Sequence, residues 1–492
     1  MRMPPWLIVV LAPLLPASGA AAHILTYHNS NLRHGAYVVP GLTLAAAANM
    51  HRDTGFNAAL SGHIYAQPLY WRPKNTHPGL VIAATESNIV YALNDTTGAI
   101  VWQTQLAPSV PLSELPCGNI DPMGITGTPV IDPHTATLYL NAMTETANGP
   151  RHLVYALSLA DGSVLPSWPI DMEAALTGRG ATFSSAFHGE RSALLFFGGS
   201  LYVNYAGNAG DCGTYHGTVV QIDPIAASVT ANWQSRGLRG GIWAQGGIAG
   251  DGASLFVTTG NTKGVTDWSD GEAIIRLRPG LLRSDRSKDF FAPANWQALD
   301  QSDKDLGGTE ALPLDIALGG GARAKRVIAF GKDGNAYLAD RARLGGIGGQ
   351  LATLAVSTSP IRTAPAVYQT DAATMVAFSS AIGGNCADKN ITMLNVAASG
   401  TSPMSVAWCA PYDGAGAPII TTTDGKSNPI VWVVGAQGDN LLHGFDALTG
   451  APVFAGGDTA MSGLHHFVTI IATQSRFYVA ADNAVYAFKF TP

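Results

Sequence analysis

The residues best suited to chemistry in this sequence are charged and polar side chains in predicted loops. Only 13% of the 492 residues are Asp, Glu, Lys or Arg, so a gathering of such groups is informative. Carboxylates, amines and imidazoles exchange protons in enzyme sites. The candidates are Gln67, Glu86, Asn88, Asp211, His216, Trp243, Gln245, Asn261, Asp303, Asp305, Lys332, Asp333, Arg362, His465 and His466.

The elements that position these residues follow a repeated pattern. An apolar strand leads to an Asp or Asn, a tight turn with Gly, and a second strand that ends in a large aromatic. The pattern is clearest in YALNDTTGAIVW (Tyr91–Trp102) and GFDALTGAPVF (Gly444–Phe454), with weaker copies from Tyr155, Val220 and Met393. Asp or Asn bonds the backbone of its own turn and Gly supplies positive φ, so each copy predicts a β-hairpin.

A second element, of small or polar residues before a short apolar strand, precedes each hairpin. Eight starts occur, at Ala66, Gly127, Ser184 (SSAFHG, the most degenerate), Ala244, Gly307, Thr363, Gly416 and His465. Their near-even spacing predicts an all-β, eight-bladed β-propeller of four-stranded antiparallel blades, because radial repetition protects sheet edges. The loops before first strands and between second and third strands then meet at one channel mouth, where the candidates lie.

The final repeat is one strand short at Pro492. We expect residues 42–60 to supply the missing outer strand and close the ring. No stretch has the composition of an interdomain linker, so the sequence predicts a single propeller domain over residues 23–492.

The first 22 residues have the order of a secretory signal peptide: Arg2, an apolar run from Trp6 to Leu15, and small residues from Ala17. No later segment reaches the roughly 20 unbroken apolar residues of a membrane span. The net charge of −6 and the lack of a basic stripe argue against nucleic acid as a partner. We expect an exported protein, periplasmic or secreted.

Four cysteines in an exported chain indicate two disulfides. The sequence leaves their connectivity open. Cys117 with Cys212 and Cys386 with Cys409 is the preferred pairing, because all four fall near loops at one rim. No CxxCH motif for covalent haem is present.

Four motifs in order resemble the central third of pyrroloquinoline-quinone (PQQ) dependent alcohol and methanol dehydrogenases. They are GGIW ending at Trp243, LFVTTGN ending at Asn261, DKDLGG around Asp305, and GKDGNAYLADR around Lys332. The resemblance implies that Trp243 stacks on the flat quinone and that Asn261 ligates Ca²⁺. It also implies that Asp305 is the general base and that Lys332 stabilises the reduced quinone.

Gln245 and Arg362, in adjoining loops, are further candidates for cofactor binding. The family has a calcium-binding glutamate where this chain has Cys212, so Asp211 beside it becomes the candidate second metal ligand. The family's adjacent cysteine pair is absent.

Nearly the whole mature chain resembles a second group, exported bacterial PQQ-repeat propellers mostly without an assigned function. The shared motifs are TYHNSNLRHG (Thr26–Gly35), HIYAQPLYW, GITGTPVIDP and YHGTVVQID. They indicate the fold and not the chemistry.

Structural interpretations compete at each position. Trp243 also fits packing between blades, while Asn261, Asp305, Lys332 and Asp333 fit turns. His465 and His466 would point to opposite faces of a strand and so would not share one metal.

Two functions remain open. One is a PQQ- and calcium-dependent oxidoreductase that oxidises an alcohol or sugar and passes electrons to a separate acceptor. The other is a non-catalytic propeller that binds or scaffolds an envelope protein.

Overall fold

A computed structural model describes residues 23–491 except 74–77, 285, 381–389 and 458–459. The predicted signal peptide, residues 1–22, lies outside the described residues. No helix among those described is long and apolar enough to cross a membrane.

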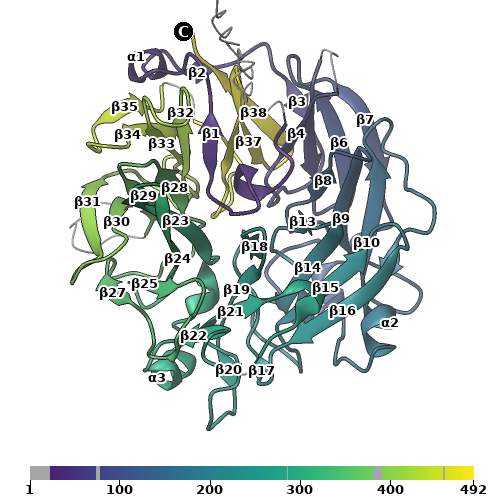
Figure 1. Cartoon of the computed structure of the whole chain (residues 1–492). Helices are drawn as coiled ribbons and strands as arrows, with labels where there is room; N and C mark the ends of the chain where they lie inside the picture. The colour runs from purple at the N-terminus through teal and green to yellow at the C-terminus, as the bar shows by residue number, and fades with distance from the viewer. Residues whose placement is uncertain (1–22, 74–77, 285, 381–389, 458–459, 492) are drawn as a thin grey trace, which may run out of the picture.

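The described strands form eight antiparallel blades in sequence order around a central axis (Figure 1). The predicted fold class and blade count are therefore confirmed. The first strands of the blades are β4 (Leu69–Trp71), β8 (Val130–Asp132), β13 (Leu195–Phe197), β18 (Ala249–Gly250), β23 (Leu312–Gly319), β28 (Ala366–Gln369), β32 (Ile419–Thr422) and β36 (Ile470–Ala472). The second strands are β5 (Leu80–Ala84), β9 (Thr137–Thr144), β14 (Ser200–Gly207), β19 (Leu255–Thr259), β24 (Ala322–Phe330), β29 (Thr374–Ser379), β33 (Ile430–Val434) and β37 (Arg476–Ala481).

The third strands are β6 (Ile89–Asn94), β10 (Arg151–Ser158), β15 (Thr218–Asp223), β21 (Ala273–Leu277), β25 (Asn335–Asp340), β30 (Ile391–Val396), β34 (Leu442–Asp446) and β38 (Ala484–Lys489). The fourth strands are β7 (Ile100–Gln105), β11 (Ile170–Asp171), β16 (Ser228–Gln234), β22 (Phe290–Ala292), β27 (Ala352–Ala355), β31 (Met404–Ala410) and β35 (Pro452–Ala455). Short helices α1 (Leu44–Ala47), α2 (Met172–Thr177) and α3 (Trp296–Gln301) lie in connecting loops.

The start placed at Ser184 is wrong by about ten residues. The first strand of the third blade is β13, which follows Glu190 and Arg191, whereas the SSAFHG segment contributes the short strand β12 (His188–Gly189) beside β14. No proline lies shortly before β13, and the nearest preceding glycine, Gly189, belongs to the SSAFHG segment, so the repeat pattern placed this start too early.

The eighth blade receives its outer strands from the N-terminal region. β2 (His51–Arg52) and β3 (Ala58–Ala59) both pair antiparallel with β38. In Figure 1 these purple segments lie beside the yellow strands of the C-terminus. The segment just before the first blade and the last strands of the chain thus share one sheet. This sharing closes the ring between the first blade and the eighth.

Residues 24–35, which we call the plug, run through the centre of the ring. Their hydrogen bonds reach residues in or directly before the first strand of every blade: Tyr70, Ile131, Leu194, Gly250, Pro313, Val367, Ile420 and Thr469. Arg33 is fully buried and donates from Nε to Ile248 O at 2.9 Å and from Nη2 to Leu194 O at 3.0 Å. The TYHNSNLRHG motif therefore has a structural role.

The hairpin aromatics pack against the turn of the following blade. Trp102 Nε1 donates to Leu159 O at 3.1 Å, and Trp408 Nε1 donates to Ala447 O at 2.8 Å. A Cβ atom at Gly162 would lie 2.5 Å from the Trp102 ring. This contact repeats between blades and explains why the turn glycine and the aromatic recur together.

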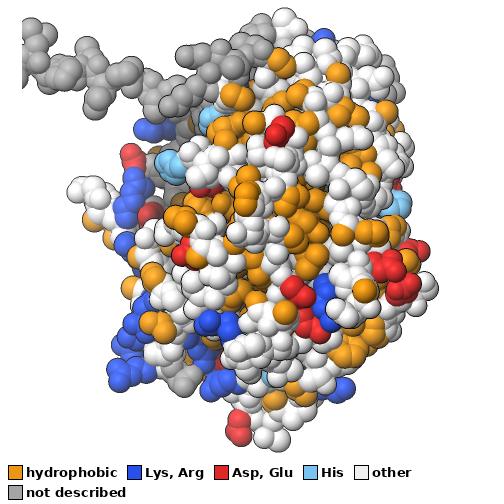
Figure 2. All heavy atoms as spheres, turned by 90° about the vertical axis from the view of Figure 1, so that its right-hand side faces the viewer, with side chains coloured by type: hydrophobic (Ala, Val, Ile, Leu, Met, Phe, Trp, Pro, Cys, Tyr) orange, Lys and Arg blue, Asp and Glu red, His pale blue; other side chains and the backbone are white. Residues whose placement is uncertain are grey.

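Two short pairings complete the sheets. β1 (Ala36–Val38) runs parallel to β32, and β26 (Gly346–Ile347) runs parallel to β22. On the outer side of the ring in Figure 2, hydrophobic side chains spread over the middle of the face and Lys and Arg lie mainly along its left and lower edges.

Candidate functional site

One cavity of about 260 Å³ opens at the channel mouth. Its lining contains all seven residues singled out above for catalysis, cofactor or metal binding: Asp211, Trp243, Gln245, Asn261, Asp305, Lys332 and Arg362. They come from different loops. Trp243 and Gln245 lie between the short strand β17 (Leu238–Arg239) and β18, Asn261 follows β19, and Lys332 follows β24. The propeller geometry brings these separated motifs together.

Half-buried Lys332 and buried Asp305 form an ion pair in the wall of this cavity. Asp305 Oδ2 lies 2.6 Å from Lys332 Nζ, and Oδ1 accepts a hydrogen bond from the Asn261 N–H at 3.3 Å. The Lys332 N–H also donates to Asp305 O at 2.8 Å, which fixes the two backbones relative to each other. Asp303, which is exposed, lies 3.1 Å from the same Nζ.

The two groups shift one another's pKa. Burial raises the pKa of Asp305 above its ordinary value, and the Lys332 ammonium offsets only part of that rise. Burial lowers the pKa of Lys332, but the carboxylates of Asp305 and Asp303 more than offset it, so the pKa lies above its ordinary value. Lys332 is therefore held as a cation beside a carboxylate of raised basicity.

Trp243 is half-buried and lies against the strand end that carries Asn261. A Cβ atom at Gly260 would lie 3.0 Å from the Trp243 ring and 3.3 Å from Asp305 Cγ. A Cβ atom at Gly241 would lie 2.7 Å from Trp243 Nε1. The glycines thus let the indole and the Asp305 carboxyl approach the same piece of backbone.

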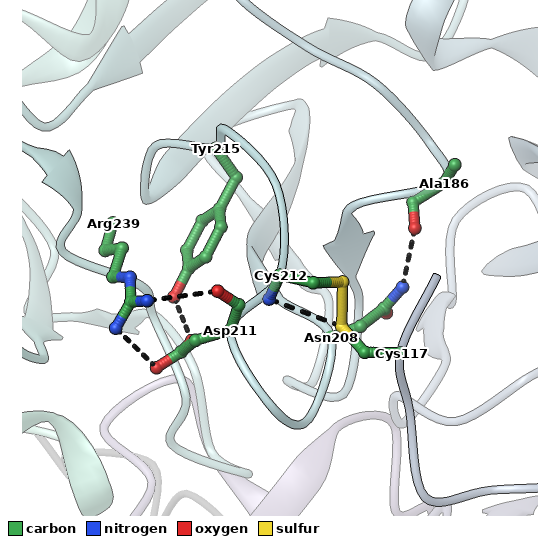
Figure 3. Close-up of a disulfide and its surroundings, with 7 residues drawn as sticks. All are labelled: Cys117, Ala186, Asn208, Asp211, Cys212, Tyr215 and Arg239. Carbon is green, nitrogen blue, oxygen red and sulfur yellow. Dashed lines mark hydrogen bonds and ion pairs between the residues drawn. A yellow bond between two sulfur atoms is a disulfide. The ribbon is translucent and has the colours of Figure 1, made fainter. Parts of the chain in front are cut away.

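Asp211 lines the cavity but is already held by two neighbours. Arg239 Nη1 lies 3.2 Å from Asp211 Oδ2, and the Tyr215 hydroxyl donates to Asp211 Oδ1 (Figure 3). The adjacent Cys212 forms a disulfide with Cys117, as predicted, and so ties the loop before β8 to the loop after β14. Cys386 of the second predicted pair lies outside the described residues.

The predicted metal ligands, Asn261 and Asp211, do not form a site suited to calcium in this arrangement. Asp211 is neutralised by Arg239 and Asp305 by Lys332, so an ion would have to displace a cation from each. Calcium takes six to eight oxygen ligands. Around Asn261, the described part of the chain brings no three His, Cys, Asp or Glu side chains together as a ligand group.

The sequence prediction missed Arg191 and Phe467, whereas His466, which was predicted, also lines the cavity. The Arg191 guanidinium lies 5.1 Å from the Phe467 ring centre. Within the described residues neither Arg191 nor the exposed Arg362 pairs with an acidic side chain. Arg191 was missed because its blade start was misplaced; a search for charged residues just before each true first strand would find it.

The two arginines of the lining, Arg191 and Arg362, give their part of the cavity a positive electrostatic character. Burial, with a smaller contribution from Arg362 nearby, lowers the pKa of Arg191 to about 10. Burial, Arg191, His465 and Arg362 lower the pKa of His466 to about 4. Arg191 and Arg362 lie close together without an acidic partner among the described residues, an arrangement that favours an anionic ligand.

Glu272 lies behind the ion pair and is also absent from the predicted set. Its Oε2 accepts from the Leu306 N–H at 2.7 Å, next to Asp305, and its Oε1 is buried without a partner. Burial and the Asp305 carboxylate raise the pKa of Glu272 well above its ordinary value. Burial therefore favours the neutral form of Glu272.

Comparison with known proteins identifies the fold. No protein-family model and no curated protein matches the chain. Among solved structures, quinohemoprotein alcohol dehydrogenase from Comamonas testosteroni has a TM-score of 0.64 and 13% identity, covering 96% of this chain and 81% of its own. A europium-containing methanol dehydrogenase has a TM-score of 0.64 and 13% identity, covering 94% and 89%. BamB from Moraxella catarrhalis has a TM-score of 0.50 and 15% identity, covering 90% and 98%.

The chain therefore has an eight-bladed propeller fold similar to that of these two dehydrogenases. At these identities the likeness extends to the fold alone.

Proposed function

We propose that this protein binds a flat, anionic quinone of the PQQ class at the channel mouth and uses it to oxidise an alcohol or sugar. One observation carries the proposal: an indole ring, three cations and a buried carboxylate line a single cavity. PQQ is a planar tricarboxylate, so its shape matches the ring and its charge matches the cations. The dehydrogenase neighbours support the same ligand class.

Each residue has a defined task in this site. Trp243 supports the ring plane, since an aromatic face binds a planar ligand without requiring particular hydrogen bonds. Arg191 and Arg362 bind the carboxylates, with Gln245 as a further polar contact. The Gln245 Oε1 atom is buried without a partner among the described residues. When bound, the quinone supplies the hydride acceptor.

The remaining chemistry belongs to Asp305 and Lys332. The Asp305 carboxylate accepts the hydroxyl proton of the substrate, a task favoured by its raised pKa. Lys332 stays charged and stabilises negative charge that develops on the ligand oxygens. We leave calcium out of the proposal, because Lys332 and Arg239 already hold the carboxylates that would bind it. Electrons leave to a separate acceptor.

We also propose that the chain works outside the cytoplasm. The signal pattern of residues 1–22 and the Cys117 to Cys212 disulfide both support export to an oxidising compartment.

A non-catalytic role is the second candidate. The internal pairing of Asp211 with Arg239 and of Asp305 with Lys332 favours it, because the loops are electrostatically satisfied without a ligand. In that case the mouth binds an envelope protein or another partner and no quinone.

Titration with PQQ separates the candidates. Full-length mature protein is titrated with and without Ca²⁺, and tryptophan quenching and quinone absorbance are followed. We expect saturable binding at micromolar PQQ in both conditions. Trp243→Ala should abolish the quenching, and Arg191→Ala should weaken binding roughly tenfold or more through the lost charge-assisted hydrogen bond.

Trp71→Phe is the control, since Trp71 stacks on His23 away from the cavity and its loss should leave the affinity unchanged. Absence of saturable binding would contradict the quinone proposal, as would unchanged binding by Trp243→Ala. Binding without turnover of any alcohol or sugar, with an artificial electron acceptor present, would favour the non-catalytic role.

A further inference from the structure

A group of two histidines and one aspartate lies where the ring closes. His63 precedes the first strand of the first blade, His465 precedes β36, and Asp482 occupies the turn between β37 and β38. His465 Nε2 lies 2.6 Å from Asp482 Oδ1, and His63 Nδ1 lies 3.0 Å from the same oxygen. One ligand atom from each residue lies within 4.8 Å of the other two.

The contact between His63 and Asp482 is not an ordinary hydrogen bond. Although the His63 side chain is 44% exposed, its Nδ1 atom is buried and has no partner in hydrogen-bond geometry. Two lone-pair atoms close together but misaligned for a hydrogen bond suit coordination of a common ion. Around a tetrahedral ion with bonds of about 2.0 to 2.1 Å, ligand atoms lie about 3.3 Å apart. The 3.0 Å separation of His63 Nδ1 from Asp482 Oδ1 is close to this value, whereas the 2.6 Å contact of His465 Nε2 with the same oxygen is a hydrogen bond that a bound ion would replace.

The ligand types select the metal. Two imidazoles and one carboxylate suit zinc and other divalent first-row metals, whereas calcium prefers oxygen alone. Three protein ligands leave a fourth position for water or another ligand. His466, the next residue, bonds Gln437 Oε1 at 3.1 Å instead. Adjacent histidines therefore serve different partners.

Neighbouring residues hold the His465 ring and the backbone of His63 and Asp482 in place. The Tyr65 ring stacks on the His465 imidazole at 4.0 Å between centres, and the His63 carbonyl accepts from the Glu86 N–H at 2.9 Å. The Asp482 N–H donates to Gly463 O at 2.9 Å. Gly463 has φ +70°, and a Cβ atom there would lie 2.6 Å from Asp482 Cβ.

We propose that His63, His465 and Asp482 form a binding site for a divalent first-row transition metal, with Zn²⁺ as the expected ion. The site joins the segment leaving β3 to the last hairpin of the eighth blade. A bound ion cross-links the two ends of the propeller and stabilises the closed ring. This site is separate from the proposed quinone function and needs no quinone.

The proposal is tested by calorimetric titration of chelator-treated, full-length mature protein with Zn²⁺, and with Ca²⁺ as the mismatched ion. We expect one tight Zn²⁺ site per chain, no comparable Ca²⁺ site, and a higher melting temperature with Zn²⁺. Changing outer partners of metal sites costs roughly 10- to 100-fold in affinity. Loss of a direct ligand in His63→Ala or Asp482→Asn should therefore cost at least about 100-fold.

His443→Ala is the matched control. His443 Nε2 lies 2.8 Å from Asp439 Oδ2, a His and Asp pair that forms no three-ligand group within the described chain. The His443→Ala variant should bind Zn²⁺ as tightly as the wild type. Circular dichroism of the metal-free variants checks that they fold. Weak, unsaturable Zn²⁺ binding by the wild type would overturn the proposal, and so would wild-type affinity in folded Asp482→Asn.

Discussion

At the scale of single residues, the site depends on charges that the fold places close together. Asp305 and Lys332 were predicted from two short motifs, because their order along the chain resembled a known one. Arg191 was not, since nothing in HGERSA distinguishes it from a surface arginine until β13 is placed. The order of the motifs therefore identified Asp305 and Lys332. It missed Arg191, which lies in the degenerate third repeat.

Buried carboxyls elsewhere in the ring give a pH-dependent stability. Burial raises the pKa of Glu86 to about 7, although its Oε2 accepts from the Gly124 N–H at 2.6 Å. Between about pH 4.5 and 7 the folded chain holds a proton that the unfolded chain releases. The contribution of this group therefore makes stability fall as pH rises through that window.

Glu86→Gln should remove this dependence. We expect the variant to unfold like the wild type near pH 4.5 and to be more stable at pH 8 by up to about 3 kcal/mol. Urea unfolding at the two pH values measures the difference. Glu114→Gln, at an exposed position, is the control. An equal stability difference at both pH values would show that the Glu86 carboxyl does not titrate as described.

At the scale of elements, the hairpin pattern predicted the blades because its residues act locally. Asp, Gly and the closing aromatic each determine a turn or a contact with the next turn. The plug could not be predicted this way, since its partners are distributed over the whole chain. The sequence showed TYHNSNLRHG as a shared motif and gave no reason for it.

Gly162→Ala tests the contact between neighbouring blades. The added methyl would meet the Trp102 ring, so we expect a loss of about 2 to 4 kcal/mol from overpacking and positive φ together. Gly149→Ala is the matched control, with φ +86° and open space around its Cβ position, and should lose only about 1 kcal/mol. Chemical denaturation gives both values. Equal losses would mean that the tryptophan contact adds nothing.

At the scale of the whole molecule, closure depends on the N-terminal region twice, through the plug and through β2 and β3. Arg33→Met should destabilise the ring by about 3 kcal/mol or more, because buried carbonyls lose their donor. Arg323→Met, which removes an exposed ion pair with Asp371, should cost less than about 1 kcal/mol. Similar effects of the two changes on the unfolding midpoint would contradict a stabilising plug.

The blade count followed from repetition and needed no tertiary information. Whether the mouth holds a ligand depends on how Arg191, Arg362 and Lys332 face one cavity, which repetition does not specify. The fold was therefore largely predictable, while the electrostatic character of the site required the structure.

A crystal structure of the mature protein soaked with PQQ tests the central claim most directly. The account predicts density for one planar ligand stacked on Trp243, with carboxylates toward Arg191 and Arg362 and a quinone oxygen near Lys332. An empty cavity at saturating PQQ, or a ligand bound elsewhere on the ring, would contradict it.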